Sequence, residues 1–317
     1  MTRVRNEDDI IESFVRHHAT LADRFIILDN SSDDRTVEVL KSLRFEGFPI
    51  TLFQCDSVAF AESAHNTFLA RQAASLGADW VLCLDSDEFV DQRRFGNDLR
   101  AYLSLLPRAQ GHVHAGMLNY NCTVEDDPNE LIVPNRILFR EKTICSHKVF
   151  IRSASLLAGA VVANGNHDVF VDSATLPILY DPNLLLAHYP TRSGWQLLAK
   201  AFVGRIKLLA SGAREGPDTA NHYRVLLSNL DEHPEWILSE YFLKQMRLVD
   251  DSLELDPIHY RGGSLRYTNS SDPVTKAARS VMAFSESLAR RHGALIDELP
   301  NVKRSVQSLD GDIQQIF

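Results

Sequence analysis

The sequence predicts an α/β protein in which a mostly parallel sheet is flanked by helices and followed by a helical C-terminal extension. In roughly the first 90 residues, short apolar runs alternate with segments whose apolar residues recur at helical spacing, a pattern typical of strands joined by crossover helices. After about residue 193, helical periodicity replaces this alternation. We therefore expect an α/β domain over residues 1–209 and an extension over residues 210–317.

In the first half, strand and helix alternate. Buried strands are expected where a short apolar run ends in polar residues, at residues 25–28, 50–53 and 80–84. Helices are expected between the strands, at about residues 7–21, 33–43 and 61–76. Asn6 and Asp9 suit a capping box for the first helix, and Ser32 or Asp33 suits the cap of the second. Residues 3–5 are too few and too charged for a whole strand, so we expect the chain to begin inside its first strand.

The second half becomes β-rich from residue 111 and helical after residue 188. Further strands are expected at residues 148–151 and 169–171, and further helices at residues 193–209, 223–230 and 236–249. Residues 258–267 predict a hairpin with a Gly-Gly turn. The apolar stripes of the extension must be buried against the core, a second subunit in a homodimer, or a membrane surface.

The composition suits a globular protein and disfavours a nucleic-acid partner. Of the 317 residues, 44% are hydrophobic and 24% are charged, which is ordinary for a soluble domain. The 33 basic and 42 acidic side chains give a formal net charge of −9, whereas a nucleic-acid binder usually carries a basic stripe. A phosphate-bearing small molecule remains compatible, because a bound divalent cation can supply positive charge locally.

Cysteine spacing and hydropathy predict a cytoplasmic location. The four cysteines include no C-x-x-C pair, and we interpret them as thiols in a reducing compartment. No stretch approaches the ~20 apolar residues of a membrane span, and the first residues show no apolar signal region. We therefore expect a cytoplasmic protein, with peripheral contact at the inner face of a membrane as the alternative.

Two acidic loops follow predicted strands at the edge where α/β sheets bind ligands. Ligands bind beyond the carboxyl ends of parallel strands, where Asp29 and Asp85 begin loops. In the run from Asp85 to Asp87, alternate residues of an extended segment project to the same side, and two carboxylates there suit Mg²⁺ or Mn²⁺. Such an ion can bridge the phosphates of a nucleotide diphosphate and stabilise it as a leaving group. The alternative for Asp85 and Asp87 is a solvated loop, and for Asp29 a turn or helix cap.

Several motifs in order resemble one family. They are Asn6-Glu7, Asp29-Asn30-Ser31-Ser32-Asp33-Asp34-Arg35-Thr36, Asn66, Leu84-Asp85-Ser86-Asp87-Glu88-Phe89, His147-Lys148-Val149, Asn166-His167-Asp168 and His188-Tyr189-Pro190-Thr191-Arg192-Ser193. This order is similar to the GT-A nucleotide-sugar domain of glycosyltransferase family 2, in the branch that shades into family 92. The similarity spans about residues 3–207 and leaves the extension unmatched.

The resemblance implies an inverting, metal-dependent glycosyltransferase of glycan or polysaccharide biosynthesis. It would move a sugar from a nucleotide diphosphate sugar to a hydroxyl-bearing glycan or a lipid-linked acceptor. By this resemblance Asp29 and Asn66 face the nucleoside, Asp85 and Asp87 contact the metal and diphosphate, and His167 is a further metal ligand. The alternative for His167 is a histidine that only ties down its loop.

The general base and the phosphate-binding cations are less sharply defined. The resemblance favours Asp168 as the base that deprotonates the acceptor, with Glu88 and Asp126 or Asp127 as alternatives. Lys200 lies on a predicted helix after Arg192 and can reach the diphosphate. The alternative for Lys200 is a solvated helix face.

Two other functions compete with sugar transfer. A nucleotidyltransferase that makes sugar nucleotides should carry a Gly-rich, basic phosphate loop near its N-terminus, and residues 3–6 contain no glycine. A non-catalytic sugar- or partner-binding protein on the same fold would be favoured by loss of one aspartate from the pair, yet both are present.

Overall fold

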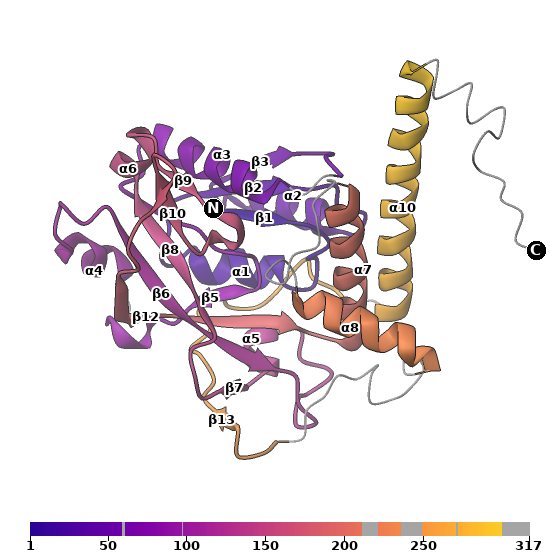
Figure 1. The fold of residues 1–317 in the computed structure, drawn as a ribbon. Coiled ribbons are helices and arrows are strands. Elements are labelled where there is room, and N and C mark those ends of the chain that lie inside the picture. The colour runs from indigo at the N-terminus through magenta and orange to yellow at the C-terminus, as the bar shows by residue number, and fades with distance from the viewer. Residues whose placement is uncertain (59–60, 97, 211–220, 236–248, 271, 300–317) are drawn as a thin grey trace, which may run out of the picture.

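The computed structural model describes residues 1–58, 61–96, 98–210, 221–235, 249–270 and 272–299 (Figure 1). It confirms the predicted α/β class, with a parallel sheet, flanking helices and a helical C-terminal region. Within the described residues, no helix combines the length and apolar character needed to cross a membrane.

A three-stranded parallel sheet forms the N-terminal part of the fold. Its strands are β1 (Thr2–Val4), β2 (Phe25–Asp29) and β3 (Ile50–Gln54), with β2 in the middle. The helices that follow these strands are α1 (Ile11–His18), α2 (Thr36–Glu46) and α3 (Glu62–Ser75). Every residue of β2 is buried, because helices and strands enclose it, and its short apolar run reads correctly as a buried strand.

Backbone bonds of Met1 join this sheet to a second, mixed one. The amino group of Met1 donates to the Leu82 carbonyl at 2.7 Å, and the Leu84 amide donates to the Met1 carbonyl at 3.2 Å. These bonds place β4 (Trp80–Leu82) beside β1 in parallel orientation. The carboxyl ends of β1, β2 and β4 therefore face the same edge.

Beyond β4, most strand pairs are antiparallel, so the sheet is less parallel overall than predicted. Its other strands are β5 (Glu88–Val90), β6 (His112–Asn121), β7 (Phe139–Glu141), β8 (Ser146–Arg152), β12 (Tyr180–Thr191) and β13 (Leu253–Leu255). β6 and β12 pair in parallel, whereas β4–β8, β6–β8, β6–β7, β5–β12 and β7–β13 are antiparallel. Helices α5 (Val133–Arg136) and α6 (Ser153–Leu157) are too short to act as parallel crossovers.

Smaller elements complete the region before residue 192. They are the 3₁₀ turns η1 (Gln92–Arg94) and η2 (Asn164–Asn166), helix α4 (Leu99–Leu105), and a small antiparallel sheet of β9 (Val161–Val162), β10 (Val169–Val171) and β11 (Ala174–Thr175). The predicted strand at residues 169–171 is thus confirmed as β10.

The C-terminal helices pack on one another and on the core. They are α7 (Gly194–Ala210), α8 (Asn221–Glu232) and α10 (Pro273–Glu298), and Figure 1 shows α7 beside α10. The α8 residues Leu227 and Leu230 are buried against Leu198 and Ala201 of α7, so the core covers this predicted stripe. The helix predicted at 236–249 lies outside the described residues except for its last position. The boundary after residue 209 remains a prediction.

The predicted hairpin at residues 258–267 is wrong. No strand occurs there, because the buried carboxylate of Glu12 takes up the local backbone donors. The amides of Arg266, Tyr267 and Thr268 donate to Glu12 at 2.7, 2.9 and 2.7 Å. Arg16 pairs with the same carboxylate at 2.8 Å. Glu12 therefore organises this segment as a loop folded over α1.

The predicted helix caps are also wrong. Helix α1 begins at Ile11 instead of near Glu7, and Asn6 adopts a left-handed backbone with φ of 56°. The Asn6 side chain instead accepts from the Asp33 amide at 2.9 Å. At the start of α2, Asp34 accepts from the Thr36 amide at 2.9 Å. Asn6 thus bonds to the loop before α2 instead of capping its own helix. A contact between two segments cannot be recognised from the residue pattern of either segment alone.

Replacing Glu12 by Gln should lower the free energy of unfolding by about 2–4 kcal/mol at pH 7, because an amide cannot satisfy three backbone donors and a guanidinium together. Its hydrogen bonds hold the pKa of Glu12 below its usual value. The stabilisation is therefore present above the unfolded pKa and is lost as pH falls through the folded pKa. Urea unfolding at pH 7 and pH 3 measures both effects. Glu38→Gln, at an exposed pair on α2, is the control, and equal stability of the two variants would contradict the role of Glu12.

Candidate active site

The loop between β4 and β5 carries the predicted acidic pair into a mostly buried setting. Asp87 is 2% exposed and Glu88 is fully buried, whereas a third of the Asp85 side chain is exposed. The Tyr189 amide of β12 donates to the Asp87 carbonyl at 2.8 Å. The acidic pair is therefore a fixed part of the sheet edge and not a solvated loop.

Lys148 of β8 ties Asp85 and Glu88 together. Its ammonium lies 2.6 Å from Asp85 Oδ2 and 2.9 Å from Glu88 Oε1, and donates to the Gly165 carbonyl at 2.6 Å. Burial opposes the charge on Lys148, but the two carboxylates raise its pKa above the usual value. Burial raises the pKa of Glu88 despite Lys148. Lys148 is thus a buried, permanently charged group in contact with the β4–β5 loop.

Asp87 faces a separate set of polar groups. Lys200 of α7 lies 2.9 Å from Asp87 Oδ2, while Arg192 Nη1 and His188 Nε2 each lie 3.8 Å from this carboxylate. Burial alone would raise the pKa of Asp87, but the charges of Lys200 and Arg192 hold it below its usual value. Asp87 therefore stays ionised at neutral pH, as a metal ligand requires.

His188 presents an open nitrogen toward Asp87. Its Nδ1 lies 2.8 Å from Asn119 Oδ1, and because an amide oxygen only accepts, Nδ1 carries the proton and Nε2 keeps a lone pair. Burial lowers the pKa of His188 to about 4, so the ring is neutral at pH 7. Ligands of this kind usually donate their other N–H to an outer partner.

The best-placed group for a divalent ion is Asp87, Glu88 and His188. Each offers one ligand atom, and these atoms lie within 4.8 Å of one another. Carboxylate and imidazole donors fit Mn²⁺, and carboxylates fit Mg²⁺. His188 was absent from the predicted metal set, although β12 pairs it directly with Glu88 of β5. Only this strand pairing brings His188 to the acidic residues, and the pairing cannot be recognised from the sequence alone.

His167 lies next to Asn166, whose side chain faces Asp85, and outside the group formed by Asp87, Glu88 and His188. Its Nδ1 lies 2.6 Å from the His147 carbonyl, so Nε2 keeps its lone pair. The ring covers Gly165, where an added Cβ would come within 2.5 Å of Nε2. Asn166 Nδ2 lies 3.4 Å from Asp85 Oδ1. The role of His167 as a ligand remains a prediction.

Asp168 belongs to a second polar group. Its Oδ1 lies 3.8 Å from His147 Nε2, and about a third of its side chain is exposed. His114 completes a possible ligand set with these two. However, the Leu179 amide donates to His114 Nδ1 at 3.0 Å, so the proton of the neutral ring is on Nε2 and no lone pair remains for a metal. The accessible pair in this group is therefore His147 and Asp168.

Asp29 and Asn66, the residues predicted to face the nucleoside, both form hydrogen bonds within the protein. Asp29 accepts from the Ser32 amide at 3.2 Å, which is the turn considered as its alternative. Asn66 is buried, and its Nδ2 lies 3.4 Å from the Ala163 carbonyl. Both lie at or near the carboxyl edge of the parallel sheet, and their contact with a nucleoside remains a prediction.

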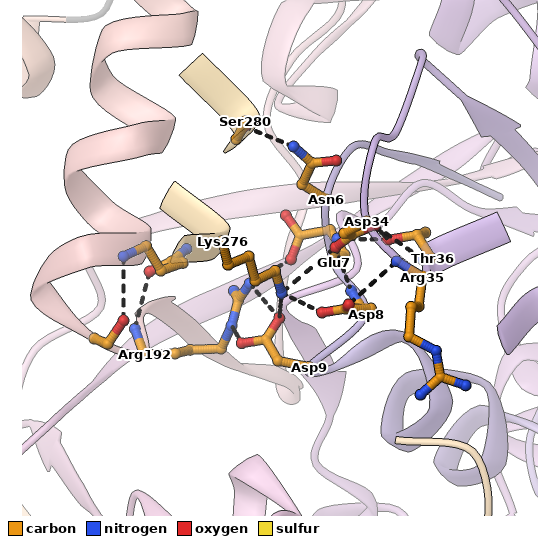
Figure 2. Close-up of polar contacts among 12 residues, drawn as sticks. Asn6, Glu7, Asp8, Asp9, Asp34, Arg35, Thr36, Arg192, Lys276 and Ser280 are labelled. Atoms are coloured by element: carbon orange, nitrogen blue, oxygen red, sulfur yellow. Dashed lines mark hydrogen bonds and ion pairs between the residues drawn. The ribbon is translucent and has the colours of Figure 1, made fainter. Parts of the chain in front are cut away.

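An acidic loop after β1 contacts Arg192, which also lies beside Asp87. Figure 2 shows Arg192 and Lys276 reaching this loop. The buried Arg192 binds Glu7 at 2.5 Å and Asp9 at 2.7 Å. Lys276 of α10 pairs with Asp8 and lies 3.8 Å from Asp9. Sequence reasoning missed this network, because its members lie more than 180 positions apart along the chain.

Comparisons with known proteins show distant likenesses only. Neither a protein-family model nor a curated protein matches the chain. S. aureus TarS 1–349 in complex with UDP is similar over 76% of this chain and 73% of that chain, with 14% identity and a TM-score of 0.36. The mannosyltransferase PcManGT from Pyrobaculum calidifontis, in complex with GDP-Man and Mn²⁺, is similar over 96% of this chain and 81% of that chain, with 12% identity and a TM-score of 0.38. This chain spans 46% of the length of another S. aureus TarS structure. These scores lie below 0.5, so the function has to be inferred from the site itself.

Replacing Lys148 by Met should lower the free energy of unfolding by about 3–5 kcal/mol, because it leaves buried carboxylates without their cation. Adding Glu88→Gln to this variant should recover part of the loss, since one buried charge is then removed. Urea unfolding of the two single variants and the double variant measures the coupling. Lys142→Met, at an exposed position, is the control. Strictly additive losses would contradict a functional ion pair between Lys148 and Glu88.

Proposed function

We propose that this protein is an inverting, metal-dependent glycosyltransferase with a GT-A type core. The observation that carries the proposal is the meeting of Asp85 and Asp87 at the carboxyl edge of the sheet, with buried cations behind them and the neutral His188 beside them. In open α/β sheets, ligands bind beyond the carboxyl ends of the strands, which is this edge. An ionised carboxylate pair can hold a divalent ion, and such an ion together with the nearby cations suits a diphosphate whose negative charge grows during reaction.

The residues fit a divalent ion at Asp87. Asp87 and His188 would hold it, with Asp85 directed to the diphosphate. Lys200 now occupies Asp87 Oδ2 at 2.9 Å, and its side chain is about a third exposed, so it can turn from Asp87 to the phosphates. The ion, when bound, supplies positive charge that stabilises the departing diphosphate.

The transfer step needs a base on the face of the sugar opposite the nucleotide. The bond between the anomeric carbon and the diphosphate oxygen breaks, and its electron pair leaves with the nucleoside diphosphate. The acceptor oxygen forms the new bond and its proton passes to the base. We assign this base to Asp168, which is partly exposed beside His147. Glu88 is fully buried, with Lys148 beside its Oε1 and the Asp85 amide bonded to its Oε2, so it cannot reach an acceptor.

The acidic loop after β1 disfavours the nucleotidyltransferase alternative. Such an enzyme has to hold a triphosphate near this loop. Here Glu7, Asp8 and Asp9 gather negative charge there, and Arg192 and Lys276 are engaged in neutralising it. A donor whose diphosphate lies farther along the edge, near Asp85 and Asp87, would instead meet positive charge from the divalent ion and from Lys200.

Replacing Asp87 by Asn should abolish thermal stabilisation by UDP or GDP in Mn²⁺ and lower turnover of nucleotide sugars roughly 100-fold or more. The amide keeps the shape but removes the charge. Donors are found first by screening UDP- and GDP-sugars for slow hydrolysis by the wild-type protein. Asp23→Asn, at an exposed pair with Arg100, controls for loss of a surface charge. Near wild-type turnover by Asp87→Asn would rule out this assignment.

Two histidine variants separate His188, proposed as a metal ligand from its place beside Asp87, from His167, predicted as a ligand from the sequence. His188→Asn should raise the Mn²⁺ concentration for half-maximal nucleotide binding about tenfold or more. His167→Asn should change it less, because His167 lies outside the group formed by Asp87, Glu88 and His188. Mn²⁺ titrations at fixed UDP or GDP make the comparison. The reverse order would assign the ligand to His167.

A further inference from the structure

Helix α10 packs along α7 but buries few of its own side chains. Of its 26 residues only Ala277, Ser280 and Phe284 are buried. They recur at the spacing of one helical face. Polar contacts lie along the same face, where Asn6 Nδ2 donates to Ser280 Oγ at 2.6 Å and Lys276 pairs with Asp8. Figure 2 shows Lys276 and Ser280 reaching the loop after β1. A long helix held by one short stripe can separate from the core without uncovering a large apolar surface.

The ring of Phe284 packs against two basic side chains, Arg5 and Lys207. It is 1% exposed, with the Arg5 guanidinium carbon 4.7 Å and the Lys207 ammonium 5.8 Å from its centroid. Aromatic faces attract cations, and a guanidinium also stacks on them. The ring is therefore held by contacts that any flat aromatic group of similar size could make.

The cations around Phe284 mark the carboxyl edge of the parallel sheet. Arg5 directly follows β1 and donates to the Asn30 carbonyl at 2.7 Å. Asn30 directly follows β2, and Lys207 donates to its side-chain oxygen. Asn30 Nδ2 in turn donates at 2.9 Å to the carbonyl of Cys55, which follows β3. Phe284 thus lies over the ends of three parallel strands, where α/β sheets bind their ligands.

We propose that Phe284 occupies the nucleobase position of the donor site, so that α10 competes with the nucleotide within the same chain. This inference rests on the proposed function. The ligand is a nucleoside diphosphate: its base would replace the Phe284 ring beside Arg5 and Lys207, and its phosphates would extend toward Asp85 and Asp87. Helix α10 has to move aside for the donor to bind, and Lys276 and Ser280 hold it in place until then.

Intramolecular competition makes a definite prediction for affinity. If the open form makes up about a tenth of the molecules or less, the apparent Kd for a nucleotide is raised about tenfold or more. In the full-length protein, Phe284→Ala should therefore bind UDP or GDP in Mn²⁺ at least about tenfold more tightly than wild type. Met282→Ala, two residues away on the same helix and 71% exposed, should bind as wild type does. Isothermal titration calorimetry measures both.

A labelling experiment leaves Phe284 in place and covers the case in which Phe284→Ala fails to fold. In a Cys145→Ser background, which removes the exposed thiol, a buried Ser280→Cys thiol should react slowly with a maleimide. Adding UDP or GDP with Mn²⁺ should accelerate the reaction. A Met282→Cys thiol should react quickly under both conditions.

The outcomes separate the two proposals. If nucleotide binds to wild type but Phe284→Ala binds no more tightly and Ser280→Cys labelling is unchanged, α10 is not a competitor and the proposed function stands. If neither wild type nor Phe284→Ala binds a nucleotide or turns over a nucleotide sugar, the proposed function fails and the competition fails with it.

Discussion

The ammonium of Lys148 is the interaction on which the candidate site depends. It sits on β8, the strand that bonds to both β4 and β6, and it reaches Asp85, Glu88 and the Gly165 carbonyl at once. Two carboxylates in a buried loop would repel each other and lose hydration. Lys148 offsets both effects, and it also joins the loop after β4 to the segment that carries His167 and Asp168. The backbone of the site is thus organised around one buried charge.

A second balance of charge connects the N-terminal loop to the C-terminal helices. Glu7, Asp8 and Asp9 would destabilise a short loop if left together, since like charges repel at low dielectric. Arg192 at the end of β12 and Lys276 of α10 supply the compensating charges. Because Arg192 also lies 3.8 Å from Asp87, a change in this loop is felt at the acidic pair. The region after residue 209 is therefore electrostatically linked to the candidate site.

Local sequence patterns predicted most strands and helices of the α/β region. Helix caps, the loop at 258–267 and the position of His188 depend on contacts between distant segments. The apolar runs at β2, β3 and β4 and the helices α3, α7 and α8 follow from periodicity along the chain. The caps of α1 and the hairpin at 258–267 failed, because Asn6 and Glu12 bind backbone groups of distant segments. Asp85 and Asp87 were recognisable because both lie in one loop. His188 was not, because it meets Glu88 only through the pairing of β12 with β5.

Helix α10 begins with a regular cap and attaches to the core through a small buried stripe. Asp272 and Pro273 form a proper helix start, with the Thr275 amide donating to Asp272 at 2.9 Å. The stripe that packs on the core, however, contains a single large apolar residue, Phe284. A helix meant to stay in place would bury a broad apolar face. One that has to exchange with a ligand should instead combine a small buried stripe with polar contacts that water can replace, and α10 has that composition.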